Sequence, residues 1–183
     1  LDNLEELHIT GCKLYAFPAA VAVGENLQVL NFAGTYFRVM PGYGEYMYVG
    51  YEDPGAFQEV LDQYFQAISL KELYLDFCIF DNLSGLRNLT NLEVLSLTRC
   101  ELTELPVDYV AGCDSLRELN LERNTISDIS FVAELPALES INLWDCYVTD
   151  LSPLLQCENL QYVNAKNNPV GTNPLTGVEV ILE

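Results

Sequence analysis

The chain has few basic residues. Of its 183 residues, 8 are Lys or Arg against 27 Asp or Glu, which gives a formal net charge of −19. Such a charge repels the phosphates of nucleic acids and the anionic headgroups of membranes. We therefore expect neither nucleic acid nor a bare membrane surface as a partner. The acidic excess is typical of a solvated exterior, and a cationic partner or loosely held calcium are the alternatives.

Long apolar runs are missing as well. No run approaches the roughly 18 residues that a membrane-spanning helix needs. The longest candidate, Leu14–Gly24, superficially resembles a signal-peptide core, but acidic residues precede it where such a segment carries positive charge. We predict no direct membrane insertion and interpret Leu14–Gly24 as part of the folded domain.

Catalytic and cofactor motifs are also lacking. The single histidine, His8, has no nucleophile poised beside it by the logic of a catalytic triad. Zinc would need a C-x-x-C pair and calcium a D-x-D-x-D-G loop, and neither is present. Gly42 and Gly44 lack the remaining residues of a phosphate-binding loop. We predict a non-enzyme that carries no cofactor and no metal.

What the chain does contain is a repeat, L-x-x-L-x-L-x-x-C/N-x-L. Its copies begin at Leu4, Leu27, Leu70, Leu92, Leu116, Leu138 and Leu160. Successive copies start 22 to 24 residues apart, except for one step of 43 residues. A fixed period of about 20 to 29 residues with this leucine spacing resembles the leucine-rich repeat.

The repeat itself favours a stack of coils. Its L-x-L core alternates, so the leucines point inward from a short strand while their neighbours point outward. The buried C/N side chain can bond backbone groups of the adjacent coil, which Asn does better than Cys. We predict an α/β solenoid: a leucine-rich repeat horseshoe with a parallel concave sheet and 3₁₀ or short helices on the convex side. Residues 1–183 form one domain in this interpretation.

Two stretches carry a more specific resemblance. Residues 126–138 and 148–160 resemble the 22-residue repeats of bacterial internalin-like proteins. The resemblance implies a short 3₁₀ turn on the convex side and partner binding through the concave face. Leu102–Pro106 instead resembles the slightly longer repeats of receptor ectodomains.

All six cysteines fall on inward positions of the repeat. Cys12, Cys78, Cys100 and Cys146 occupy the C/N position, and Cys113 and Cys157 precede a repeat start by three residues. A buried free thiol acts there as a small apolar side chain. A bridge between Cys78 and Cys100 is the alternative, because adjacent coils stack about 4.8 Å apart.

The long step predicts an insertion over residues 38–69. Its first half holds Tyr43, Tyr46, Tyr48 and Tyr51 among Gly and Pro. Such a segment is either a binding loop or a cover for the solenoid edge. Its second half predicts a helix that starts at Asp53 and packs on the convex side. The apolar face of that helix holds Phe57, Val60, Leu61, Tyr64, Phe65 and Ile68.

The outward strand positions predict the concave surface as three columns. The first runs Glu6, Val29, Glu72, Val94, Glu118, Ser140, Tyr162; the second His8, Asn31, Tyr74, Ser96, Asn120, Asn142, Asn164; the third Thr10, Ala33, Asp76, Thr98, Glu122, Trp144, Lys166. The aromatic residues Tyr74, Trp144 and Tyr162 mark a contact surface. Trp144 and Tyr162 come from consecutive coils, so we expect them to sit together. The acidic pair Glu118 and Glu122 faces water and indicates no catalysis.

The two ends differ. Val178, Val180 and Leu182 alternate within a closing segment, 171–183, which predicts a terminal strand. The first repeat begins without a polar cap, so we expect the chain to be a fragment of a longer protein.

These patterns predict a protein–protein interaction module that binds another protein through the concave face and the Tyr-rich insertion. The alternatives are a structural spacer within a larger surface protein and a carbohydrate-binding module. The resemblance favours an extracellular or bacterial cell-surface location, whereas unpaired cysteines favour the cytoplasm. The oligomeric state and the identity of the partner stay open.

Overall fold

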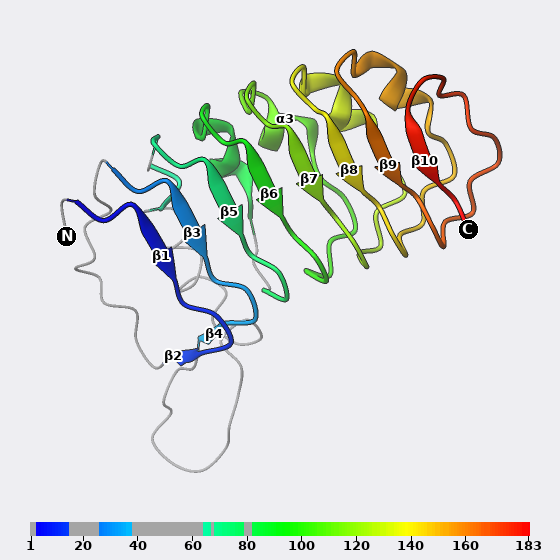
Figure 1. Ribbon diagram of the computed structural model, residues 1–183. Coiled ribbons are helices and arrows are strands. Elements are labelled where there is room, and N and C mark those ends of the chain that lie inside the picture. The colour runs from blue at the N-terminus through cyan, green and yellow to red at the C-terminus, as the bar shows by residue number, and fades with distance from the viewer. Residues whose placement is uncertain (1–2, 15–25, 38–63, 67, 79–81) are drawn as a thin grey trace, which may run out of the picture.

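The computed structural model describes residues 3–14, 26–37, 64–66, 68–78 and 82–183. In this part of the chain, successive coils stack side by side, and each contributes one strand to a single sheet (Figure 1). The strands are β1 (Glu6–His8), β3 (Val29–Asn31), β5 (Glu72–Tyr74), β6 (Val94–Ser96), β7 (Glu118–Asn120), β8 (Ser140–Asn142), β9 (Tyr162–Asn164) and β10 (Glu179–Ile181). Neighbours pair in parallel and in chain order. The predicted leucine-rich repeat solenoid is confirmed.

The middle residue of every strand points into the core. This inward column runs Leu7, Leu30, Leu73, Leu95, Leu119, Ile141, Val163 and Val180. From Leu30 to Val163 these side chains are at most 2% exposed, whereas Leu7 and Val180 at the two ends are half-buried. Fully burying such a side chain contributes about 2 kcal/mol. Stacking between two neighbours provides that burial to every inner coil.

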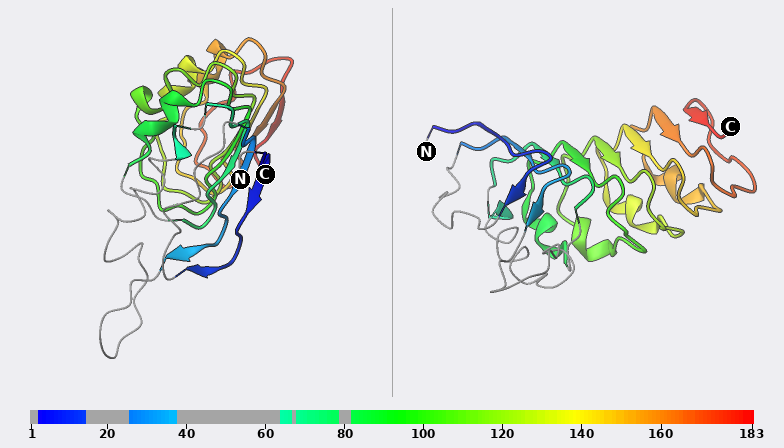
Figure 2. Two further views of the ribbon diagram at one scale, coloured as in Figure 1. Left: turned by 90° about the vertical axis from the view of Figure 1, so that its left-hand side faces the viewer. Right: turned by 90° about the horizontal axis from the view of Figure 1, so that it is seen from below.

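Short helical turns lie on the side opposite the sheet (Figure 2). They are η1 (Ser84–Asn88), α3 (Val107–Val110), η2 (Ser130–Glu134) and η3 (Ser152–Gln156), and the η elements are 3₁₀ helices. A side chain just before each 3₁₀ helix forms a hydrogen bond with the first residue of that helix. The side-chain Oδ1 of Asn82, Asp128 or Asp150 accepts from the N–H two residues later, at 2.6, 2.8 and 2.8 Å. This contact satisfies a donor that the helix start leaves unpaired. The turn implied by the internalin-like resemblance is therefore present.

The C/N position joins each coil to the next, as predicted. Asn124 donates from Nδ2 to the carbonyl oxygens of Leu97 and Leu121, both at 2.8 Å. Its Oδ1 accepts from the N–H groups of Cys100 and Leu102, both at 3.0 Å. The Cys100 Sγ instead reaches a single carbonyl of the preceding coil, at 3.1 Å. Asparagine thus uses both ends of its amide where cysteine offers one weak donor.

All six cysteines are free thiols. Five are buried, and Cys12 in the first coil is half-buried. The alternative bridge between Cys78 and Cys100 is not formed: their Sγ atoms donate to separate backbone carbonyls, at 3.4 and 3.1 Å. Burial raises the pKa of the Cys78 and Cys113 thiols to about 12. Because the thiolate is the reactive form, both side chains are inert at neutral pH.

The first two coils contain a second sheet that the sequence patterns did not predict. Its strands β2 (Lys13–Leu14) and β4 (Tyr36–Phe37) pair in parallel. Each follows the turn at the C/N position, which is Cys12 in the first coil and Thr35 in the second. Figure 1 shows this small sheet below β1 and β3, apart from the later coils.

The end of the predicted insertion enters the core. Tyr64 and Phe65 are 2% and 1% exposed, and the Tyr64 ring meets Phe32 edge-on with the centroids 5.4 Å apart. Phe65 fills the space beside Gly85, where an added Cβ would lie 2.1 Å from its ring. Ile68 is 65% exposed, so its predicted place on the buried helix face is wrong. The reason is that the chain is helical at Tyr64 but forms a turn at Phe65, Gln66 and Ile68.

The rest of the insertion, residues 38–63, lies outside the described residues. This range includes Tyr43, Tyr46, Tyr48, Tyr51 and the helix start at Asp53, and both the loop and the helix stay predictions. Most of Leu14–Gly24 also lies outside them. Among the described residues, no helix is long and apolar enough to cross a membrane.

The closing strand is confirmed. In β10, Val180 pairs with Val163 of β9 and continues the inward column. Leu182, which follows the strand, is 37% exposed. The two ends of the described chain lie at opposite ends of the sheet (Figure 1).

Candidate functional site

The outward positions form the three columns that the repeat predicts, and together they define the concave face. Strand register aligns the first two columns from β1 to β10. The third is aligned by hydrogen bonds to the carbonyls of Ala33, Asp76, Thr98, Glu122, Trp144 and Lys166 from the preceding coils. The face carries the carboxylates of Glu6, Glu72, Asp76, Glu118, Glu122 and Glu179. Lys166 is the one Lys or Arg on these columns. The concave face is therefore strongly acidic.

Neighbouring side chains hold several of these carboxylates in place. The Tyr74 hydroxyl donates to Glu72 Oε2 at 2.8 Å. Asp76 Oδ1 accepts two hydrogen bonds from the following coil, one from the Ser96 hydroxyl at 2.6 Å and one from the Thr98 N–H at 2.7 Å. Because these contacts fix the side chains, the negative charges are presented in a defined pattern.

Asparagines of the second column shape the strand ends. The Oδ1 atoms of Asn31, Asn120, Asn142 and Asn164 accept from the N–H two residues later, at 2.9, 3.1, 3.1 and 3.2 Å. Such a bond favours a turn. It leads the chain off each strand and orients the third column, a role that the sequence patterns did not assign to these residues.

Tyr74 lies in the middle of the acidic surface. It is half-buried, and burial together with the hydrogen bond to Glu72 raises its pKa to about 12. The negative charges of Glu118 and Asp76 contribute to the same increase. Tyr74 therefore stays protonated and keeps donating to Glu72 across the physiological pH range.

Trp144 and Tyr162 do not sit together, so that prediction is wrong. Tyr162 is level with Ser140 of β8, whereas Trp144 is two outward positions further along. At about 3.3 Å per residue, two outward positions correspond to about 13 Å. The neighbour of Trp144 is instead Arg123, whose guanidinium carbon lies 4.5 Å from the centroid of the Trp144 ring. The Trp144 Nε1 is buried and has no hydrogen-bond partner among the described residues.

The remaining candidates are less informative. His8 is exposed in β1, with its Nε2 3.3 Å from Glu6 Oε2. The four tyrosines of the insertion lie outside the described residues. In the described ranges, no group of three or more His, Cys, Asp or Glu residues could hold a metal ion.

A feature that sequence reasoning missed lies where each coil leaves the sheet. The residue just before the C/N position has a positive φ, between 54° and 65°, in all seven coils. This left-handed column runs Gly11, Gly34, Phe77, Arg99, Arg123, Asp145 and Asn167. The glycines at the same offset in the first two coils were the one sequence signal for it.

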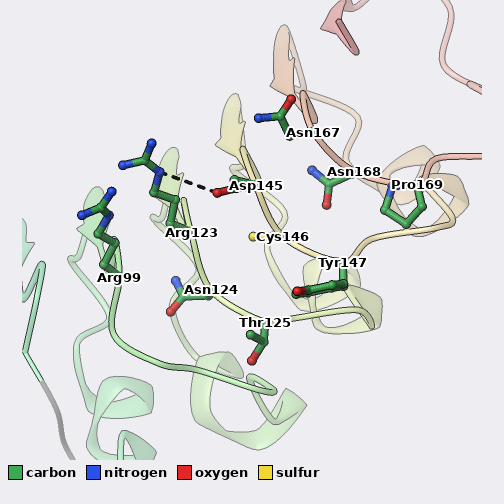
Figure 3. A pocket seen from close by; sticks show the side chains of 10 residues that line it. All are labelled: Arg99, Arg123, Asn124, Thr125, Asp145, Cys146, Tyr147, Asn167, Asn168 and Pro169. Carbon is green, nitrogen blue, oxygen red and sulfur yellow. Dashed lines mark ion pairs between the residues drawn. The ribbon is translucent and has the colours of Figure 1, made fainter.

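The left-handed column borders a groove of about 810 Å³, the edge groove (Figure 3). Its lining includes Arg99, Arg123, Thr125, Asp145, Tyr147 and Asn167. Figure 3 shows Arg99 and Arg123 next to each other, and the Arg123 Nε lies 3.7 Å from Asp145 Oδ2. Tyr147 is 59% exposed. The edge groove thus combines cationic and aromatic groups beside an acidic face.

A family model described as leucine rich repeat matches residues 90–148, which run from just before the β6 coil to Val148, two residues after the C/N position of the β8 coil. These residues contain leucine-rich repeats, and the described chain folds as a leucine-rich repeat solenoid. Among solved structures it is similar to internalin C2 of Listeria monocytogenes, with a TM-score of 0.76 and 21% identity over 100% of this chain and 72% of that chain. This likeness in fold agrees with the internalin-like repeats identified from the sequence.

Two further comparisons place this leucine-rich repeat chain among larger proteins. The Arabidopsis receptor kinase HAESA, in complex with the peptide hormone IDA and the co-receptor SERK1, gives a TM-score of 0.64 at 23% identity, covering 92% of this chain and 26% of that chain. The volume-regulated anion channel subunit LRRC8B of mouse is 26% identical over 152 residues, 79% of this chain. The chain spans 17% of the length of the curated relatives it matches.

Proposed function

We propose that this leucine-rich repeat protein binds a partner protein with a basic surface through its concave face. The charge of that face carries the proposal: six carboxylates and one lysine lie on its three columns, with Tyr74 and Tyr162 among them. Opposite charges on two proteins increase the rate at which they associate, and they weaken the binding of proteins with the same charge. Aromatic side chains supply the contact area on which affinity depends.

The fold supports protein binding as the general role. Leucine-rich repeat proteins generally mediate contacts between proteins, and HAESA is seen in complex with a peptide hormone and a co-receptor. Stacked repeats provide an extended surface for such contacts. Because binding needs no catalytic group, we propose a non-enzymatic role for this chain.

Tyr74 is the centre of the proposed contact. A Lys or Arg side chain that approaches it meets the ring together with the nearby charges of Glu72 and Glu118. A cation over a tyrosine ring is stabilised by about 0.5 to 2 kcal/mol, depending on its exposure to water. The hydrogen bond to Glu72 holds the ring in place, so little side-chain entropy is lost on binding.

Trp144 and Tyr162 extend the proposed contact toward the last coils. Tyr162 is level with Ser140 on one side and Glu179 on the other. We also propose Tyr43, Tyr46, Tyr48 and Tyr51 of the insertion as residues that contact the partner. Carbohydrate binding is the less favoured function, because rings that stack on one sugar have to be adjacent, and the register separates Trp144 from Tyr162.

A charge-defined peptide tests the proposal. We expect a fluorescently labelled acetyl-hexalysine amide to bind the wild-type chain saturably, and acetyl-hexaglutamine amide not to bind. The double variant Glu118→Gln and Glu122→Gln is expected to weaken hexalysine binding at least tenfold. The control, Glu134→Gln with Glu158→Gln, removes the same charge from exposed positions away from the sheet. Equal weakening in both variants would refute the concave site.

Tyr74→Ala and Tyr74→Phe separate the ring from the hydroxyl. We expect Ala to lower the affinity for hexalysine several-fold, because the ring face is lost. Phe is expected to retain most of the affinity, because it keeps the ring.

For location, we propose the outside of a cell, on the strength of the internalin-like repeats. The free cysteines are compatible with it, because burial raises the pKa of all five buried thiols and suppresses their oxidation. Labelling by a membrane-impermeant biotin reagent on intact cells of the source would test it, and protection until lysis would indicate the cytoplasm.

A further inference from the structure

The left-handed column contains side chains that its backbone conformation does not favour. A left-handed residue with a Cβ costs about 1 to 2 kcal/mol, except that glycine, asparagine and aspartate adopt it more easily. The first two coils have Gly11 and Gly34 there, and the last two have Asp145 and Asn167. The three middle coils instead have Phe77, Arg99 and Arg123, at φ values of 59°, 54° and 57°. These three side chains are therefore not explained by backbone stability.

Phe77, Arg99 and Arg123 follow one another along this column, and each arginine of this strip lies over an aromatic ring. The guanidinium of Arg99 lies over the Phe77 ring, 5.5 Å from its centroid, and that of Arg123 lies over Trp144 at 4.5 Å. Phe77 is 45% exposed. Arginine and large aromatic residues are the types enriched where protein interfaces hold most of their binding energy.

The charges of this strip and of the edge groove favour a negatively charged ligand. Arg123 lies 3.7 Å from Asp145 and 4.0 Å from Glu122, whereas Arg99 forms no ion pair within the described part of the chain. The charged residues that line the edge groove are Arg99, Arg123 and Asp145, which leaves one positive charge there. In a chain of net charge −19, this local excess is opposite to the rest of the surface.

We propose that the edge groove is a second binding site, which takes a carboxylate of an acidic peptide between Arg99 and Arg123. Adjacent coils are about 4.8 Å apart, so both guanidinium groups can donate to the two oxygens of one carboxylate. The Asp145 carboxylate already occupies such a place beside Arg123. Tyr147 and Asn167 provide ring surface and amide groups for the residue that carries the carboxylate.

A monoanion fits the groove better than a phosphate group. One negative charge neutralises the positive charge of the lining, whereas a phosphate of nearly two charges leaves an excess close to Asp145 and Glu122. The carboxylate can belong to an Asp or Glu side chain or to a chain terminus. The site is independent of the basic partner proposed for the concave face, because the two ligands have opposite charge.

The test measures binding of labelled peptides by fluorescence anisotropy at about 0.15 M salt, where charges more than about 8 Å apart are largely screened. We expect acetyl-hexaglutamate amide to bind saturably and acetyl-hexaglutamine amide not to bind. Acetyl-hexaglutamine with a free C-terminus is the third probe. Whichever carboxylate-bearing peptide binds identifies the source of the group, and no saturable binding by either overturns the proposal.

Arg99→Asn and Arg123→Asn locate the site. Asn is chosen because Asn167 occupies the same column, so the backbone should be undisturbed. Each variant is expected to lower the affinity at least tenfold while the melting temperature stays equal or rises. Arg87→Asn, which removes a charge from an exposed position in η1, is the control and should bind like wild type.

Two results contradict the assignment to the edge groove. One is an Arg99→Asn variant with wild-type affinity, and the other is an Arg87→Asn variant weakened as much as the groove variants. Emission of Trp144, the single tryptophan of the chain, provides a second readout because Arg123 lies over its ring. These variants leave Glu118 and Glu122 intact, so hexalysine binding reports separately on the concave face.

Discussion

The first two coils and the coils from Leu92 onward fill the same structural positions with different chemistry. At the left-handed position the early coils use glycine and the middle coils use arginine. At the C/N position the first two coils have Cys12 and Thr35, whereas later coils include Asn124 and Asn168. The comparison indicates that the solenoid requires a left-handed conformation at the first position and a hydrogen-bond donor at the C/N position. The residue at the C/N position determines how strongly neighbouring coils are joined, and the residue at the left-handed position determines which side chain is exposed at the edge of the sheet.

The largest expected difference concerns the C/N position. Asn124→Ala leaves the N–H groups of Cys100 and Leu102 and the carbonyl of Leu97 without their partner, at about 1 to 3 kcal/mol for each unsatisfied group, whereas the Leu121 carbonyl keeps the Cys146 thiol as a donor. We expect the free energy of unfolding to fall by about 4 kcal/mol in urea titrations. Cys12→Ala, at a half-buried thiol that contacts a carbonyl of its own coil, should change it by less than about 1 kcal/mol. Similar losses of unfolding free energy in Asn124→Ala and Cys12→Ala would show that the C/N residue joins the coils equally strongly in both regions.

The inward column gives the next difference. Leu119 is 2% exposed and lies between two coils, so Leu119→Ala should lower the free energy of unfolding by about 3 kcal/mol. Leu7 is half-buried in the first coil, and Leu7→Ala should lower it by about 1 kcal/mol. Thermal unfolding of the two variants side by side measures this ratio. An equal loss would mean that the first coil is packed as tightly as the inner ones.

Gly85 marks the boundary between the two regions. An added Cβ would overlap the Phe65 ring, so Gly85→Ala should destabilise the chain by about 2 kcal/mol through displacement of the insertion end. The matched control is Gly85→Ala in a Phe65→Gly background, because glycine removes the three side-chain atoms within 2.7 Å of the added Cβ, so the substitution should cost much less there. An equal loss in both backgrounds would count against this packing.

At the left-handed column, we expect substitutions in the early and middle coils to change the stability of the fold in opposite directions. Gly34→Ala should destabilise by about 1 kcal/mol, because the added Cβ meets no close neighbour and only the backbone preference is affected. Arg99→Asn should stabilise by up to about 1 kcal/mol for the same reason. Calorimetric melting temperatures of both variants test the pair, and a destabilised Arg99→Asn variant would show that the arginine supports the fold.

The smallest expected effect depends on pH. Hydrogen bonds from Ser152 hold the pKa of Asp150 below its usual value of 3.8. A lowered pKa means that the ionised carboxylate stabilises the folded state above about pH 4, and that this contribution is lost as the pH falls through the folded pKa. The melting temperatures of wild type and Asp150→Asn should therefore differ at neutral pH and converge as the pH falls through the folded pKa of Asp150. A constant difference would contradict this role.

The regular parts of the molecule could be predicted from sequence because one apolar spacing recurs in every coil. That spacing placed Leu95 and Leu119 in the inward column, Asn124 at the junction between coils and Tyr74 on the outer face. The separation of Trp144 from Tyr162 was missed because only their place in consecutive coils was considered, although the repeat puts Tyr162 in the first column and Trp144 in the third. The position along the strand depends on the register as well.

The edge groove could not be predicted for a different reason. Arg99 and Arg123 occupy unconstrained positions of the repeat, and their importance depends on a backbone conformation that leucine spacing does not encode. Gly11 and Gly34 at the same offset indicated it. The exposure of Ile68 was missed because helical spacing continues in the sequence after the helix itself has ended.

The most direct test of the central claim is an NMR titration of the ¹⁵N-labelled chain with acetyl-hexalysine amide. The acidic concave face predicts saturable shifts of backbone amides in β5, β6 and β7, including Tyr74 and Glu118, while η1, η2 and η3 stay unchanged. Shifts that follow the helical turns, or that spread evenly over all exposed acidic residues, would contradict a binding site on the concave face.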